Sequence, residues 1–194
     1  MKRIALIVGL VAVALTGCVV QSFYPFCTEK SVIDSKPLLG EWKLQQWFND
    51  DVSTNNIKSW TFEENKTLQA FDVRNAGAEF KYCLFKLGDN LFLDAEPGAL
   101  DKDAKVNELW IFSVRPTHVV CKVEVTGERL SLTLLDYDWM KKNTKLPFLE
   151  ETNDHKLYTA TSEQWETFLR ENAGNTNAFP AKPSFVLVRP KKTS

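Results

Sequence analysis

The hydrophobic and polar positions between residues 38 and 136 form short runs that are rich in β-branched and aromatic residues. In the run 118–125, every second residue from Val119 onward is hydrophobic, and Lys122 and Glu124 alternate with them. A period of two is typical of a strand with one buried face. About eight such runs follow one another, at residues 38–48, 57–64, 67–74, 79–87, 90–96, 108–115, 118–125 and 129–136.

Turn-forming residues separate these runs at 65–66, 75–77, 88–90 and 127–128. Connections this short favour antiparallel hairpins, because a parallel crossover needs a dozen or more residues. We therefore predict a mainly β domain, in which an antiparallel meander of about eight strands closes into a barrel. The stretch 96–106 is the longest predicted loop and a candidate rim or lid.

Helical patterns come only late in the chain. Residues 136–143 predict a short helical turn, and a longer helix is predicted near 161–173. Thr161 can cap that helix, with Gln164 at capping-box spacing. Its apolar stripe should pack on the outside of the barrel, and the stripe consists of Trp165, Phe168 and Leu169. A final strand is expected from Ser184.

The N-terminus has the pattern of an export signal. Lys2 and Arg3 precede an apolar run at 4–15, which is too short to span a membrane comfortably. The next residues resemble the lipobox of bacterial lipoproteins, which here consists of Leu15, Thr16, Gly17 and Cys18. This resemblance implies cleavage before Cys18 and lipid on its thiol. An ordinary signal peptide with a chance cysteine is the alternative.

The resulting division of the chain is a lipoprotein signal peptide at 1–17, a lipidated tether at 18–36, one barrel-like domain at 37–190 and a tail at 191–194. Because Val19 rather than aspartate follows the cysteine, we expect anchoring in the outer membrane, facing the periplasm. The aromatic patch of the tether is open to two interpretations, contact with the domain or with lipid headgroups. It consists of Phe23, Tyr24 and Phe26 around Pro25.

Charge and composition narrow the function classes. The chain has 24 basic and 25 acidic residues, and cleavage removes Lys2 and Arg3, so the mature domain is slightly acidic. The basic residues are scattered, which argues against a nucleic-acid partner. Three cysteines remain beyond the lipobox. A Cys83–Cys121 disulfide is conceivable, since both lie in strand-like runs, but unpaired core cysteines are the default expectation.

Candidate chemistry is sparse. The two histidines are His118 and His155, and no nucleotide, metalloprotease or serine-hydrolase motif is present. His118 and Cys121 are three residues apart, which places them on opposite faces of a strand. The Asp136/Asp138 pattern, like that at residues 101 and 103, lacks the further ligands of a calcium loop. We predict no catalytic residues, no cofactor and no metal.

Two resemblances extend this picture. Gly40 and Trp42 open the first strand and resemble the GxW signature of lipocalins, in which the tryptophan closes one end of the barrel. The segments YPFCTEK, LLGEW, FKLGDNLFLD, LLDYDWMKKN and YTATSEQWETFLRENAG resemble, in this order, a family of uncharacterised bacterial lipoproteins. That family implies no activity, and Cys27 stands where its members have tyrosine.

A lipocalin-like barrel implies a binding module for a small apolar or amphipathic ligand. We expect the barrel mouth to be lined by Trp42, Trp60, Phe62 and Phe85. The alternative is an envelope adaptor that binds another protein through its surface, suggested by hydrophobic residues on both faces of the runs 80–85 and 108–115. We expect the helix or the tether to cover those runs.

Overall fold

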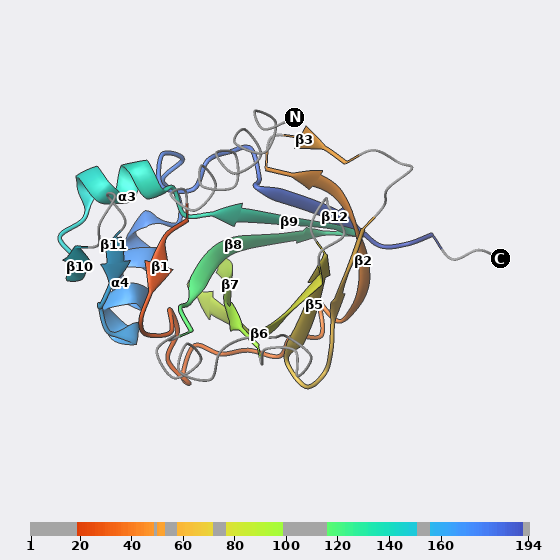
Figure 1. Cartoon of the computed structure of the whole chain (residues 1–194), viewed down its shortest axis with the longest axis horizontal. Coiled ribbons are helices and arrows are strands. Elements are labelled where there is room, and N and C mark those ends of the chain that lie inside the picture. The colour runs from red at the N-terminus through yellow and green to blue at the C-terminus, as the bar shows by residue number, and fades with distance from the viewer. Residues whose placement is uncertain are drawn as a thin grey trace, which may run out of the picture.

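A computed structural model describes residues 19–48, 50–52, 58–71, 77–98, 116–150 and 156–191 (Figure 1). Its main feature is a closed, antiparallel barrel of eight strands, in which each strand pairs with the next along the chain. The barrel strands are β2 (Gly40–Trp47), β4 (Ser59–Phe62), β5 (Thr67–Phe71), β6 (Gly77–Leu87), β7 (Asn90–Pro97), β8 (Val119–Thr126), β9 (Arg129–Leu134) and β12 (Phe185–Val188). The predicted fold class is confirmed.

The last strand closes the barrel, because β12 pairs with β9 on one side and with β2 on the other. A two-residue strand, β3 (Asp50–Asp51), pairs with the far end of β2. Strand β7 pairs directly with β8. The run 108–115, which was predicted as a strand, falls outside the described residues. The eighth strand is therefore the one that follows the late helix.

The two ends of the barrel differ in their connections. One end has three tight turns, in which Lys66, Gly88 and Gly127 adopt the positive φ angles that such turns require. These are three of the four predicted turns. The connections from β2 to β4, from β5 to β6 and from β7 to β8 all start and finish at the other end. Most of the predicted loop 96–106 lies outside the described residues.

Trp42 closes the end that carries the tight turns. Its side chain is fully buried, its Nε1 donates to the Leu38 carbonyl over 2.6 Å, and the Arg189 guanidinium lies 3.8 Å from its ring centroid. Gly40 has φ +96°, and a Cβ there would be 3.0 Å from the Arg189 Nη1. The GxW pattern thus combines a glycine that the backbone requires with a tryptophan that plugs the barrel.

A second hydrophobic core lies outside the barrel, between its wall and the remaining elements, which gather on one side in Figure 1. These elements are helices α3 (Tyr137–Asn143) and α4 (Ser162–Asn172) and a small sheet of β1 (Gln21–Ser22), β10 (Phe148–Glu150) and β11 (Lys156–Tyr158). Both helices and the Thr161/Gln164 capping box were predicted correctly. No helix in the described ranges is long and apolar enough to cross a membrane.

The segment predicted as a tether is folded onto the barrel from Val19 onward. Phe26 is fully buried, with its ring centroid 4.4 Å from that of Trp165 on α4. Next along the chain, residues 31–33 hydrogen-bond to β6 beyond the end of β5 and cover its free edge. On the outer face of the run 80–85, Phe85 is fully buried in the core that α4 and the N-terminal segment complete, as expected, whereas Lys81 stays exposed. The aromatic patch is divided, because Phe23 stays 41% exposed.

Replacing Phe26 should separate the N-terminal segment from the barrel. We expect Phe26→Ala to lower the free energy of unfolding by about 3–5 kcal/mol, the range for a buried phenylalanine. Phe23→Ala, three residues away and exposed, should change it by less than about 0.5 kcal/mol. Urea unfolding followed by tryptophan fluorescence measures both. Equal losses in the two variants would contradict the packing described.

Candidate functional site

The main candidate site is a cavity of about 420 Å³ inside the barrel, at the end opposite Trp42. A cavity of this size is within the range of small-molecule sites, roughly 300–1,000 Å³. Hydrophobic side chains of all eight barrel strands line it. They include Trp47, Phe48, Trp60, Leu68, Ala70, Phe80, Leu93, Ala95, Cys121, Leu132 and Phe185, with Val19 at the margin.

The size of the inward-facing residues explains why only one half of the barrel is hollow. Large side chains fill the closed half, among them the fully buried Trp42, Phe62 and Leu84. In the open half, strands β5 and β7 contribute Ala70 and Ala95 to the lining. The rings of Trp47, Trp60 and Phe185 gather on neighbouring strands, at 5.2–6.4 Å between centroids. The small side chains of Ala70 and Ala95 leave space beside these rings.

The four residues predicted to line a barrel mouth have different positions. Trp60 lines the cavity, whereas Trp42 and Phe62 belong to the filled half. The prediction for Phe85 was wrong, because this residue belongs to the outer core and stacks on Phe92 at 5.5 Å between ring centroids. Tyr82 and Leu84 face inward on β6, so the odd-numbered neighbours face outward.

The cavity offers hydrophobic contact and almost no hydrogen bonding. None of the described residues that line it is charged. The Trp60 Nε1 is already bonded to the Phe71 carbonyl at 3.0 Å. Cys121 contributes a thiol, and burial raises its pKa to about 12, so the thiol is neutral near pH 7. This lining suits a hydrocarbon group better than a polar substrate.

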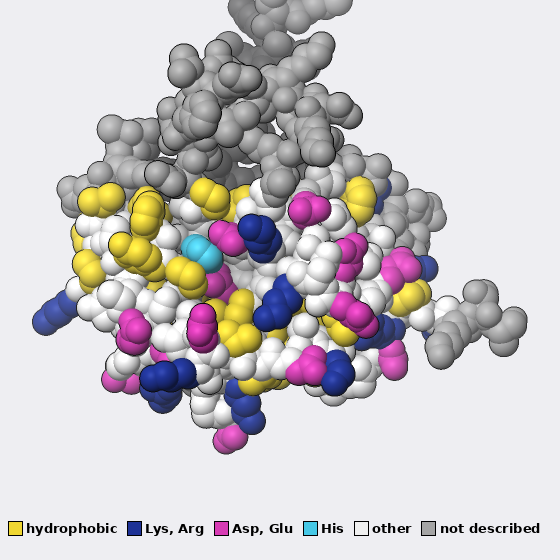
Figure 2. Space-filling model, turned by 90° about the horizontal axis from the view of Figure 1, so that it is seen from below, with side chains coloured by type: hydrophobic (Ala, Val, Ile, Leu, Met, Phe, Trp, Pro, Cys, Tyr) yellow, Lys and Arg dark blue, Asp and Glu magenta, His cyan; other side chains and the backbone are white. Residues whose placement is uncertain are grey.

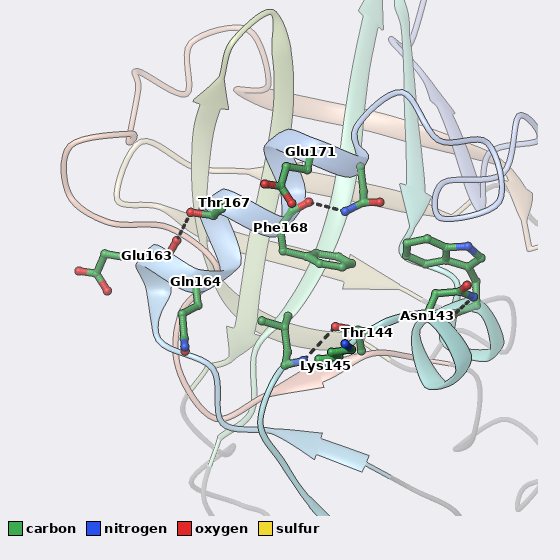
Figure 3. Close-up of a pocket in the computed structure, with 11 residues that line it drawn as sticks. Asn143, Thr144, Lys145, Glu163, Gln164, Thr167, Phe168 and Glu171 are labelled. Atoms are coloured by element: carbon green, nitrogen blue, oxygen red, sulfur yellow. Dashed lines mark hydrogen bonds between the residues drawn. The ribbon is translucent and has the colours of Figure 1, made fainter.

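A groove of about 680 Å³ between α3 and α4 is a weaker candidate (Figure 3). Its polar side chains bond within their own elements rather than converge on the hollow. Thr167 Oγ1 donates to the Glu163 carbonyl at 2.9 Å, and Asn143 Nδ2 donates to the Trp139 carbonyl at 2.8 Å. These two side chains already have hydrogen-bond partners within their own helices, so they do not point together at a ligand in the groove.

A polar cluster lies on the outer wall of the barrel, in a hollow of about 250 Å³. Asp94, almost fully buried, accepts a hydrogen bond from His118 Nδ1 at 3.0 Å and another from the Phe26 N–H at 3.2 Å. The Cys27 and Cys83 thiols line the same hollow. Figure 2 shows a histidine at the surface among hydrophobic and acidic side chains. Sequence reasoning missed this cluster.

The cysteines are arranged differently from the pairing considered in the sequence. Cys121 faces the barrel interior and Cys83 faces outward, with β7 between their strands. Two strand spacings amount to roughly 9.5 Å, beyond the reach of a disulfide. A Cys83–Cys121 bond is therefore excluded. His118 and Cys121 also lie on opposite sides of the wall, as predicted.

Asp94 and His118 modify each other's proton affinity. Burial raises the pKa of Asp94, and the hydrogen bond and charge of His118 only partly offset this. Burial disfavours the charged imidazole of His118, but the hydrogen bond and charge of Asp94, helped by Glu96, outweigh it and raise the pKa of His118. Within the described residues, no group of three or more candidate ligands is placed to hold a metal ion.

The fold and the cavity define a class, an eight-stranded antiparallel barrel that is plugged at one end and has an apolar cavity at the other. Comparisons of the chain with protein families, with curated proteins and with solved structures found no match.

The Asp94–His118 pair should make stability depend on pH. Because the pKa of His118 is raised above its usual 6.5, the folded state holds this proton more tightly than the unfolded state does. Its contribution is complete below pH 6.5 and is lost as pH rises through the folded pKa. We therefore expect the urea midpoint to fall as the pH rises above 6.5. Asp94→Asn should flatten this fall, and an unchanged slope in that variant would exclude the pair as its source.

Proposed function

We propose that this protein is a membrane-anchored lipoprotein whose barrel binds the hydrocarbon chain of a small apolar or amphipathic ligand. The observation that carries the proposal is the half-empty barrel, with about 420 Å³ of uncharged, aromatic-rich space at one end. A solidly packed interior would have contradicted this proposal. Each buried methylene group contributes about 0.8 kcal/mol, so a chain of several carbons gains useful affinity without a polar anchor.

The position of the anchor supports a lipid as the ligand. Val19 lies at the cavity margin and bridges to Asp136, and it directly follows Cys18, the residue proposed to carry lipid. Consecutive Cα atoms are 3.8 Å apart, so lipid on Cys18 holds the margin of the cavity close to the bilayer. A ligand that leaves the membrane then meets the cavity first.

The adaptor function is the second candidate, and one observation favours it. Three large hydrophobic side chains are exposed, namely those of Phe23 (41%), Tyr24 (45%) and Leu149 (57%). The Phe23 and Tyr24 rings meet edge to face at 5.1 Å and form a small apolar surface. Such a surface suits headgroups as well as a protein, so it supports the adaptor less specifically than the cavity supports ligand binding.

Filling the cavity should weaken binding without unfolding the barrel. In the chain from Val19 onward, Ala70→Phe places a ring in the cavity and displaces at least three methylene groups of a bound chain. At about 0.8 kcal/mol each, the affinity for a fluorescent fatty acid should fall about 50-fold. Ala181→Phe adds the same ring at an exposed site and serves as the control. Equal affinities in the two variants would remove the cavity as the site.

Lipidation is tested separately at the predicted cysteine. Cys18→Ser removes the thiol that receives diacylglycerol, so the variant should stay unprocessed and incorporate no labelled palmitate. Cys121→Ser, which removes a thiol inside the barrel, should be labelled like the unmodified chain. Metabolic labelling followed by immunoprecipitation measures both. Labelling of the Cys18→Ser variant equal to that of the unmodified chain would refute the predicted lipobox. It would not affect the proposal that the cavity binds a ligand.

A further inference from the structure

Two cysteines that are far apart in the sequence lie side by side on the outer wall of the barrel. The Cys27 Sγ and the Cys83 Sγ are 3.1 Å apart, and 56 positions separate the two residues. Both side chains are half-buried and line the hollow that contains His118. Cys121, the other cysteine in the described part of the chain, lies inside the barrel and provides an internal comparison.

The backbone holds the two thiols together from both sides. Immediately before Cys27, the Phe26 N–H donates to Asp94, which is the cross-strand neighbour of Cys83. A few residues later, 31–33 hydrogen-bond to β6. The segment that carries Cys27 is therefore fixed against the strand that carries Cys83, and the contact between the sulfur atoms is not the meeting of two free side chains.

We propose that Cys27 and Cys83 are a redox-active pair that forms a disulfide bond when the exported protein meets a disulfide oxidant. A disulfide bond is about 2.05 Å long, so closing the pair requires the two sulfur atoms to approach by about 1 Å. The proposal rests on the export that the predicted N-terminal signal implies, because exported proteins fold where disulfides persist. The proposal does not depend on ligand binding in the cavity.

The surroundings assign different roles to the two thiols. The hydrogen bond between the two thiols lowers the pKa of Cys83, and the positive charge of His118 acts in the same direction. The hydrogen bond to Cys83, together with burial, raises the pKa of Cys27. Cys83 is therefore the nucleophile that attacks first, and the hollow of about 250 Å³ gives the oxidant access to it.

The chemistry is a thiol–disulfide exchange in two steps. The Cys83 thiolate attacks one sulfur of an external disulfide, forms a mixed disulfide and releases a thiolate. Cys27 then loses its proton, and its sulfur attacks that of Cys83 and releases the second thiolate. In total the pair loses two protons and two electrons, and the external disulfide is reduced to two thiols. Oxidised glutathione or an oxidised dithiol protein supplies this oxidant.

The bond would join the N-terminal segment to the barrel wall. Because it closes a loop of more than fifty residues, it restricts the unfolded chain strongly, and we expect Tm to rise by about 10 °C. It would also fix the chain nine residues after the predicted anchor at Cys18. Oxidation then sets how firmly the start of the domain is held on the barrel.

Peptide mass spectrometry tests the pair in the full-length protein, expressed with its own N-terminal segment. Free thiols are alkylated at harvest, and half of the sample is then treated with oxidised glutathione before alkylation. We expect a Cys27–Cys83 linked peptide in a non-reduced digest, most abundant after oxidation. Full alkylation of both cysteines after glutathione treatment, or a link from either of them to Cys121, would overturn the proposal.

Serine variants provide the matched measurement of stability. Reduction with dithiothreitol should lower the Tm of the oxidised protein by about 10 °C, and it should do the same in Cys121→Ser. Cys27→Ser and Cys83→Ser should show no such drop, although both should fold, since serine is close in size. A drop that persists in Cys27→Ser would show that another bond is responsible and would refute the assignment.

Discussion

The pairing of β12 with both β9 and β2 is the constraint on which the rest of the molecule depends. An open sheet of seven strands would leave two exposed edges, and its inward-facing rings would have nothing to pack against. Closure requires the chain to return after α4 and insert its last strand between the first and the seventh. The helix is thus held outside the wall by the strand that follows it, and the barrel and its outer layer form together.

Alternation along the strands then divides the hydrophobic residues between two cores. On β6, Tyr82 and Leu84 face the interior while Phe85 and Leu87 face α4 and the N-terminal segment. This explains why so many strands carry hydrophobic residues on both faces without exposing them. The aromatic residues of the outer face pack in the second core, so they are not available to line the cavity.

Local signals predicted much of this fold. Period-two alternation, turn residues and the Thr161/Gln164 capping box are readable over a few positions. The capping box, three of the four predicted turns and the alternation in the described strands were confirmed. The orientation of Phe85 was not readable, since its run is hydrophobic at nearly every position. The cavity depends on the size of Ala70 and Ala95, which face one space from different strands. The contact between Cys27 and Cys83 likewise joins segments that no local pattern connects.

The N-terminal segment connects these features, because it is ordered against the domain from Val19 onward. Val19 lies at the cavity margin, Phe26 is buried under α4, and Cys27 touches the barrel wall. A flexible tether would let the barrel reorient freely above the membrane. A segment that packs on the barrel keeps its first residue at a fixed place relative to the domain. In the proposed lipoprotein, the anchor therefore fixes orientation as well as location. An apolar cavity with its margin next to the anchor can receive a hydrocarbon chain with little exposure to water, which avoids the main free-energy barrier to lipid transfer.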